Sequence, residues 1–91
     1  MFVALVMVRC RPDAVARAAQ TLAAVDGVSE VYSVTGEWDL VAQLRVPLWE
    51  DINRIVTEHI HQVDGLQRTE THVAFQVLSK KDLDAAYEGF E

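Results

Sequence analysis

The spacing of apolar residues changes along the first half of the chain, and each spacing predicts a different element. Residues 2–8 form a continuous apolar run rich in β-branched side chains, which is typical of a strand buried on both faces. Residues 13–25 carry apolar side chains at helical spacing, after a proline at position 12 that suits a first helical turn. Residues 28–35 and 38–46 alternate apolar and polar side chains, which predicts two further strands.

The second half repeats this order. Pro47 ends the preceding strand because it cannot donate a ladder hydrogen bond, and it also fits a helix start. Residues 48–61 carry an apolar stripe at helical spacing, and residues 66–78 predict a last long strand. Residues 79–82 resemble a capping box, which predicts a short C-terminal helix through residues 85–87. We therefore expect a domain over residues 1–78 and a helical extension over residues 79–91.

A short repeated segment indicates that the chain consists of two equivalent halves. Residues 24–28 read AVDGV and residues 62–66 read QVDGL, and each segment joins a predicted helix to the following strand. The chain is thus strand–helix–strand twice, with the halves joined at Gly36. This order predicts an α+β, ferredoxin-like βαββαβ sandwich, in which two helices cover one face of a four-stranded antiparallel sheet.

The two central strands predict which sheet face is buried. If Gly36 and Glu37 form a two-residue turn, Thr35 opposes Trp38 and Tyr32 opposes Val41. The predicted core face then carries Val31, Leu40, Ala42, Leu44 and Val46, and the other face carries Glu30, Tyr32, Val34, Asp39, Val41, Gln43 and Arg45. Because the second face mixes apolar and charged side chains, we expect a homodimer that packs sheet to sheet and assembles further.

Composition and charge exclude several classes. With 91 residues the chain makes one domain, and a net charge of −6, from 8 basic and 14 acidic residues, argues against direct nucleic-acid binding. A single cysteine, Cys10, excludes an internal disulfide and fits a reducing compartment. The apolar N-terminal run is too short to span a bilayer and lacks a signal-peptide pattern, so we expect a cytoplasmic protein without membrane association.

Two groups of titratable side chains invite a chemical interpretation. His59 and His61 are two residues apart on a predicted helix and point in different directions, so no metal site is expected. Glu70 and His72 share one face of a strand, as an acid–base pair would. No nucleophile, phosphate-binding loop or cofactor motif accompanies them, which favours a solvated or interface pair, no catalytic residue and no cofactor.

The segment around Gly36 has features of both a turn and a ligand site. Gly36 permits close approach of a ligand to the backbone, Trp38 offers an apolar wall, and Asp39 offers an anion for an ammonium group. Thr69 and Thr71, on the last strand, are either ordinary β-formers or hydroxyl donors to a ligand carboxylate. On chemistry alone, a plain turn is favoured for the first segment.

Two longer segments resemble a known family. Residues 28–40, VSEVYSVTGEWDL, resemble the "GV…V-TG-x-[YF]-D" segment of the Lrp/AsnC regulators. Residues 65–75, GLQRTETHVAF, resemble the "GV-x-R-T-x-T" closing strand of the same family. The resemblance extends over residues 1–78, with both segments in the expected order and spacing.

The resemblance implies the effector-binding (RAM) domain of that family. Its members have the βαββαβ fold, dimerise through their sheets, assemble into rings that are commonly octamers, and bind amino-acid effectors between dimers. Carried over by position, the ligand-binding residues are Thr35, Gly36, Glu37, Trp38, Asp39, Thr69 and Thr71. Asp39 would receive the α-ammonium group, and hydroxyl or backbone N–H groups near Thr35, Gly36 and the two threonines would hold the α-carboxylate.

The sequence departs from the family pattern at two points. It begins at the first strand, where a typical regulator has a helix-turn-helix, and this predicts a stand-alone module with a full-length regulator as a further partner. Trp38 replaces the usual Tyr or Phe, which puts the preferred ligand side chain in doubt.

Two other functional classes remain open. The first is a cofactor-free monooxygenase of the small ferredoxin-like type, with His72 or His59 in an internal pocket. The second is an assembly partner of a full-length regulator that acts without a ligand.

Overall fold

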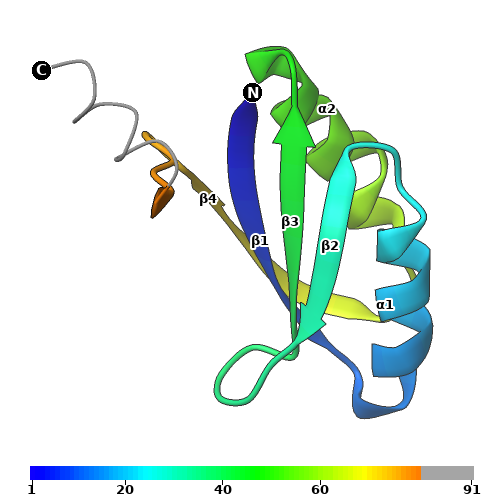
Figure 1. The fold of residues 1–91 in the computed structure, drawn as a ribbon. Helices are drawn as coiled ribbons and strands as arrows, with labels where there is room; N and C mark the ends of the chain where they lie inside the picture. Colours follow the sequence, from blue (N-terminus) through cyan, green and yellow to red (C-terminus); the bar gives the residue numbers. More distant parts are fainter. Residues whose placement is uncertain (81–91) are drawn as a thin grey trace, which may run out of the picture.

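The computed structural model describes residues 1–80 (Figure 1). Its elements are β1 (Phe2–Cys10), α1 (Val15–Ala23), β2 (Val28–Ser33), β3 (Leu40–Val46), α2 (Trp49–Glu58) and β4 (Leu66–Val73), with short 3-10 turns at Pro12–Ala14 and Ile60–Gln62. The predicted order of strands and helices is confirmed. The predicted C-terminal helix and most of the predicted extension lie outside the described residues.

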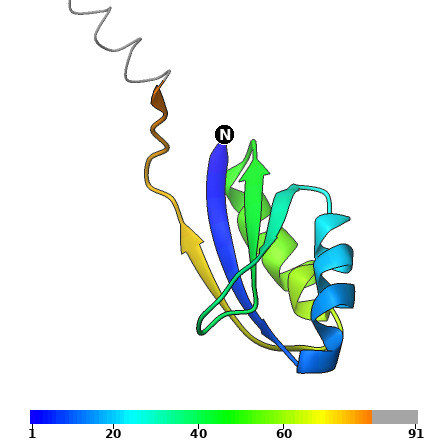
Figure 2. The ribbon, with the colours of Figure 1, turned by 60° about the horizontal axis from the view of Figure 1, so that its bottom comes forward.

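Within residues 1–80, the strands form one sheet in the order β2-β3-β1-β4, and every neighbouring pair is antiparallel. Both helices lie on the same side of this sheet, and the other side is open (Figures 1 and 2). The ferredoxin-like arrangement predicted from the sequence is therefore confirmed. In this part of the chain no helix is long and apolar enough to cross a membrane.

The core lies between the sheet and the two helices. Alternate residues of the two central strands point into it, because successive side chains of a strand face opposite ways. Its fully buried members include Ala4, Val6, Val8, Leu40, Ala42 and Leu44 from the sheet, and Leu22, Ile55 and Ile60 from the helical layer. The predicted core face of β3 is confirmed. The prediction that β1 is buried on both faces is wrong for the single chain, because no helix covers Leu5, which is 39% exposed.

Several element boundaries differ from the prediction. β4 ends at Val73 rather than at residue 78, because its neighbour β1 begins at Phe2 and the last cross-strand bond joins Ala74 N to Val3 O (2.9 Å). The first helix starts with a 3-10 turn, so α1 itself begins at Val15. The second ends at Glu58, and a separate 3-10 turn follows.

The connection between β2 and β3 is longer than a two-residue turn. The predicted register is confirmed, since Tyr32 pairs with Val41. However, β2 ends at Ser33 and β3 begins at Leu40, and the last bond between them joins Val34 N to Asp39 O (3.0 Å). The predicted Gly36–Glu37 turn is wrong, because the backbone around Glu37 turns toward β1, where an arginine holds its carbonyl oxygen. We call residues 34–39 the β2–β3 loop.

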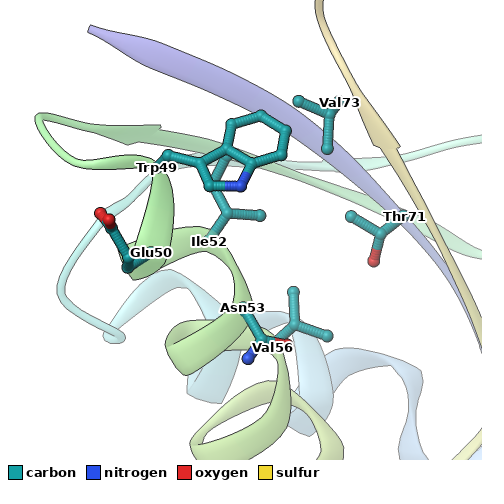
Figure 3. A pocket seen from close by; sticks show the side chains of 7 residues that line it. All are labelled: Trp49, Glu50, Ile52, Asn53, Val56, Thr71 and Val73. Carbon is teal, nitrogen blue, oxygen red and sulfur yellow. The ribbon is translucent and has the colours of Figure 1, made fainter.

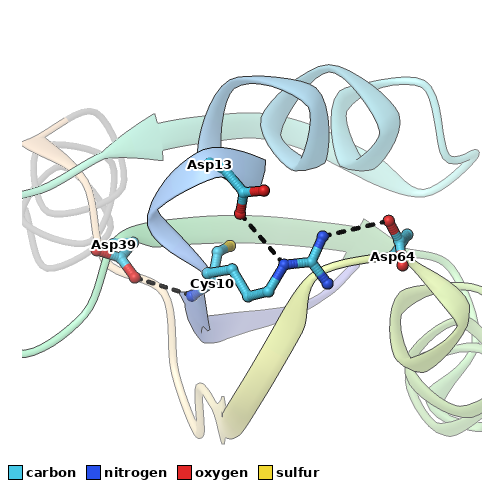
Figure 4. Close-up of polar contacts among 5 residues, drawn as sticks. Cys10, Asp13, Asp39 and Asp64 are labelled. Atoms are coloured by element: carbon cyan, nitrogen blue, oxygen red, sulfur yellow. Dashed lines mark hydrogen bonds and ion pairs between the residues drawn. The ribbon is translucent and has the colours of Figure 1, made fainter.

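The segment before α1 is tied to the start of β4. Arg11 N donates a hydrogen bond to Gly65 O (2.9 Å), and the Arg11 guanidinium lies 3.2 Å from Asp13 and 3.6 Å from Asp64 (Figure 4). Gly65 has φ +91°, and a Cβ there would lie 2.4 Å from the Cβ of Ala14. The position therefore requires glycine, both for its backbone angle and for the space it leaves.

Candidate functional site

The β2–β3 loop lies at one end of the sheet and leans over the open face, away from the helices (Figures 1 and 2). Arg9, near the end of β1, anchors its backbone. Both Nε (3.1 Å) and a terminal nitrogen of Arg9 donate hydrogen bonds to the carbonyl oxygen of Glu37. The loop is thus held by a strand that lies 28 residues away in the sequence.

Arg68 of β4 holds the side chains of the same loop. Its guanidinium lies 3.5 Å from the Glu37 carboxylate and 5.1 Å from the centre of the Trp38 ring. Such a position over an aromatic ring is an attractive cation–π arrangement. Arg9 and Arg68 are directly opposite each other in the β1–β4 register, so their side chains share the open face. Two guanidinium groups therefore meet one loop residue, Glu37.

Asp39 fixes the C-terminal end of the loop. Its Oδ2 accepts a hydrogen bond from the backbone N–H of Cys10 (2.8 Å), and its own N–H donates to Val8 O (2.9 Å) (Figure 4). Burial and, secondarily, the nearby Asp39 charge raise the pKa of the Cys10 thiol, which favours its neutral form. The Asp39 carboxylate thus binds the backbone N–H at the end of β1. This hydrogen bond occupies one of its two oxygens.

The tip of the loop is open. Gly36 has φ +101°, and a Cβ built there would meet nothing within 4 Å. Glycine is needed for the backbone angle alone, since space is available. The backbone at Gly36 can therefore be approached closely by another molecule, while both flanks of the loop are held.

The two threonines predicted to join the loop lie on the opposite face of the sheet. Thr69 and Thr71 pair with Val8 and Val6 and share their helix-facing side. Thr69 Oγ1 is 3.2 Å from His61 Nε2. Thr71 faces a cleft between α2 and β4 (Figure 3). The structure therefore gathers residues 35–39 in one loop but does not bring the threonines to it within one chain.

The cleft between α2 and β4 has a volume of about 480 Å³. It is lined by Trp49, Glu50, Ile52, Asn53, Val56, Thr71 and Val73. No histidine is among these residues. His72 lies on the open face instead, 3.1 Å from Glu70, and His59 is exposed at the end of α2. The cleft thus lacks the internal histidine that the monooxygenase hypothesis requires.

Comparison of the sequence with models of known protein families identifies the family of this chain. A model of the Lrp/AsnC ligand-binding domain matches residues 3–83. The chain belongs to the Lrp/AsnC family. It carries the ligand-binding, regulatory part of the Lrp/AsnC proteins, and the family resemblance of the two motif segments is confirmed.

Similar Lrp/AsnC proteins include an uncharacterized HTH-type transcriptional regulator from Pyrococcus abyssi, which is 31% identical over 81 residues. That match covers 86% of this chain and 54% of the regulator, so the chain spans about half the length of the curated relatives it matches. A Thermus thermophilus protein of known crystal structure is 39% identical with a TM-score of 0.83, over 88% of this chain and 100% of that chain.

A third similar structure is a transcriptional regulator/L-Met complex from Neisseria meningitidis. It has a TM-score of 0.75 at 19% identity, over 86% of this chain and 52% of that chain. At this identity the likeness shows the fold that the Lrp/AsnC proteins share.

Arg9 and Arg68 are the two residues of the candidate site that sequence reasoning missed, since both contact the β2–β3 loop. Arg68 stands inside the Lrp/AsnC-like closing segment, and Arg9 interrupts the apolar run of β1. These positions could have marked both arginines as candidate site residues. However, the two side chains lie side by side only because of the β1–β4 register, which shifts between Arg9 and Cys10. A register error of one residue would turn either side chain to the other face of the sheet.

Proposed function

We propose that this domain is an amino-acid-binding regulatory module, with the β2–β3 loop as its ligand site. The ligand would bind where two dimers meet and would change assembly, and thereby the activity of a transcription regulator. In this proposal the domain is not an enzyme, and Thr35, Gly36, Glu37, Trp38 and Asp39 form the ligand-binding loop.

The observation that carries the proposal is that the loop is anchored on both flanks while its tip is open. Before the tip, Val34 N donates a hydrogen bond to Asp39 O (3.0 Å). After the tip, Arg9 holds the Glu37 carbonyl, and Asp39 is bonded to Val8 and Cys10. A site whose backbone is already fixed loses less conformational entropy when the ligand binds, so the ligand can bind more tightly. Gly36 then offers its peptide groups without a side chain in the way.

A second argument concerns the position of the site between subunits. Thr69 and Thr71 lie on the helix face, whereas the loop leans over the open face. A ligand that touches both sets must therefore lie between different chains. Apolar side chains on the open face, including Leu5 and Tyr32, are 39% and 44% exposed, and a sheet-to-sheet dimer would cover them.

Charge and the family both support an amino acid as the ligand class. The loop supplies carboxylates for an ammonium group and the open face supplies guanidiniums for a carboxylate. The Neisseria regulator named above was solved as a complex with L-Met, which is a ligand of the same class. Because Asp39 has one oxygen bonded to Cys10, only its other oxygen would be available for an ammonium group.

The proposal is tested by titrating the protein with each proteinogenic amino acid in a calorimeter and by following assembly with light scattering. We expect one or a few amino acids to bind and to change the oligomer distribution. Binding should weaken by about tenfold or more in a Glu37→Gln/Asp39→Asn double variant, which removes both loop charges at constant size.

The matched control is an Asp26→Asn/Glu58→Gln double variant, which makes the same charge change at exposed positions in the helical layer. It should bind like the wild type. If no amino acid binds the wild-type protein, the proposed function is wrong.

A further inference from the structure

Three side chains on the open face form an unusual charge arrangement. Arg9 and Arg68 are cross-strand neighbours, and like charges at such positions repel each other. Glu37 lies against both, but through different groups. Arg9 binds its backbone carbonyl, and Arg68 binds its carboxylate. The carboxylate therefore forms its ion pair with Arg68.

The ion pair between Glu37 and Arg68 is the weak contact of the loop. Its two side chains are 61% and 58% exposed, and the closest oxygen and nitrogen are 3.5 Å apart. Exposed pairs of this kind contribute little to stability. The backbone, in contrast, is held by Arg9 and by the Asp39–Cys10 bond. The Glu37 side chain can therefore leave Arg68 while the loop keeps its place.

We propose that the Glu37–Arg68 ion pair opens to admit the zwitterionic end of a free α-amino acid. Arg68 binds the α-carboxylate, and the Glu37 carboxylate, turned away from Arg68, accepts the α-ammonium group. The inference rests on the proposed function and assigns the recognition of the ligand backbone to these two side chains.

Charge balance explains why a zwitterion fits this site. Insertion of an α-amino acid replaces one ion pair by two, so neither Glu37 nor Arg68 is left without an opposite charge. A simple carboxylate would pair with Arg68 but leave Glu37 facing a second anion. An ester or amide would pair with Glu37 but leave Arg68 unpaired. The site therefore selects free amino acids against both kinds of analogue.

Trp38 extends the proposed site beyond the ligand backbone. Its half-buried ring lies 5.1 Å from the Arg68 guanidinium, so an amino acid bound to Arg68 projects its own side chain along the indole. A flat aromatic wall favours an apolar side chain. The ligand class is thus a free α-amino acid with an apolar side chain.

Calorimetry with matched analogues tests this assignment. The probes are the proteinogenic amino acids and, for the tightest binder, its 2-hydroxy acid and its methyl ester. In the wild type, both analogues should bind at least about tenfold more weakly than the amino acid.

Glu37→Gln should weaken binding of the amino acid by about tenfold and tighten binding of the 2-hydroxy acid, because Arg68 then has no competing carboxylate. Arg68→Gln should weaken the amino acid to the level of the methyl ester. An inverted preference of this kind cannot arise from partial unfolding, which would weaken every ligand together.

The controls are Asp51→Asn and Arg54→Gln, which break a comparable ion pair (3.2 Å) on α2. They should leave all affinities unchanged. If Glu37→Gln and Arg68→Gln bind the amino acid like the wild type while Asp39→Asn does not, the inference is wrong and the proposed function stands. If the wild type binds no amino acid, both fail.

Discussion

The Asp39 carboxylate caps the end of β1 through a 2.8 Å hydrogen bond from the backbone N–H of Cys10. Asp39 belongs to the β2–β3 loop and Cys10 is the last residue of a neighbouring strand, so one bond ties the loop to the sheet. The bond gives the aspartate of the family motif a structural task in addition to any contact with a ligand.

Replacement of Asp39 by alanine should therefore destabilise the fold. It leaves the partly buried N–H of Cys10 without its acceptor, which typically lowers the free energy of unfolding by about 1–3 kcal/mol. Asp39→Asn retains an acceptor oxygen, so its free energy of unfolding should fall by less. Urea unfolding at fixed protein concentration measures the difference, with exposed Asp26→Ala as the control. Equal stabilities of Asp39→Ala and Asp26→Ala would contradict the assigned bond.

Two glycines with positive φ should respond differently to alanine. Gly65→Ala places a Cβ 2.4 Å from Ala14, so steric conflict adds to backbone strain and the loss should be about 2 kcal/mol or more. In Gly36→Ala the new Cβ has no atom within 4 Å, so only the positive φ is unfavourable. The free energy of unfolding should fall by only about 1 kcal/mol. Unfolding midpoints of the two variants compare them directly. A larger loss at Gly36 would be incompatible with an open loop tip.

The Cys10 thiol should make stability depend on alkaline pH. Burial, and secondarily Asp39, raise its pKa in the folded state, so the unfolded chain releases the thiol proton at lower pH. Stability is therefore complete below the ordinary thiol pKa and falls as the pH rises from there through the folded-state value. Unfolding curves across this range should show the fall in the wild type, and a smaller fall in Cys10→Ala. Parallel curves would refute the prediction.

Tryptophan fluorescence should report ligand binding from one position. The sequence contains 2 tryptophans, and Trp38 lies in the loop whereas Trp49 packs edge-on against Phe2 (centroids 5.9 Å apart) near the other end of β1. In Trp49→Phe, the remaining Trp38 emission should change when an amino acid binds next to its ring. In Trp38→Phe, the Trp49 emission should stay constant. A response confined to Trp49 would move the site to the cleft between α2 and β4.

A charge on the open face should weaken the proposed sheet-to-sheet dimer. Leu5 lies midway along the central strand β1, between Gln43 and His72 of the neighbouring strands. Leu5→Arg would bury an unpaired charge in a sheet-to-sheet interface, and the dimer should weaken by about tenfold or more. Sedimentation velocity measures this, with Leu48→Arg as the control, since Leu48 is 58% exposed beside α2. If only Leu48→Arg dissociates the protein, the dimer uses another face.

Much of the fold was predictable because its determinants are local. Alternation along residues 40–46 assigns each side chain of β3 to a face, and Pro47 separates that strand from α2. The repeated Asp-Gly segments mark the two helix-to-strand connections, and the strand order then follows from the usual handedness of such units.

The parts that were not predictable depend on contacts between distant segments. The loop spans residues 34–39, and its Glu37 and Trp38 contact Arg9 of β1 and Arg68 of β4. Neither arginine is near the loop in sequence. Likewise, the end of β4 is set by where β1 begins rather than by the apolar pattern of β4 itself.

The position of β1 in the middle of the sheet has a consequence for biosynthesis. β1 is made before the other described strands, but one of its two neighbours, β4, comes last among them. During translation, one edge of β1 therefore stays without its neighbouring strand, and much of its apolar surface stays exposed, until residue 73 has left the ribosome. Pairing over so long a stretch of chain slows folding, and nascent chains are exposed to aggregation or to chaperones during this interval.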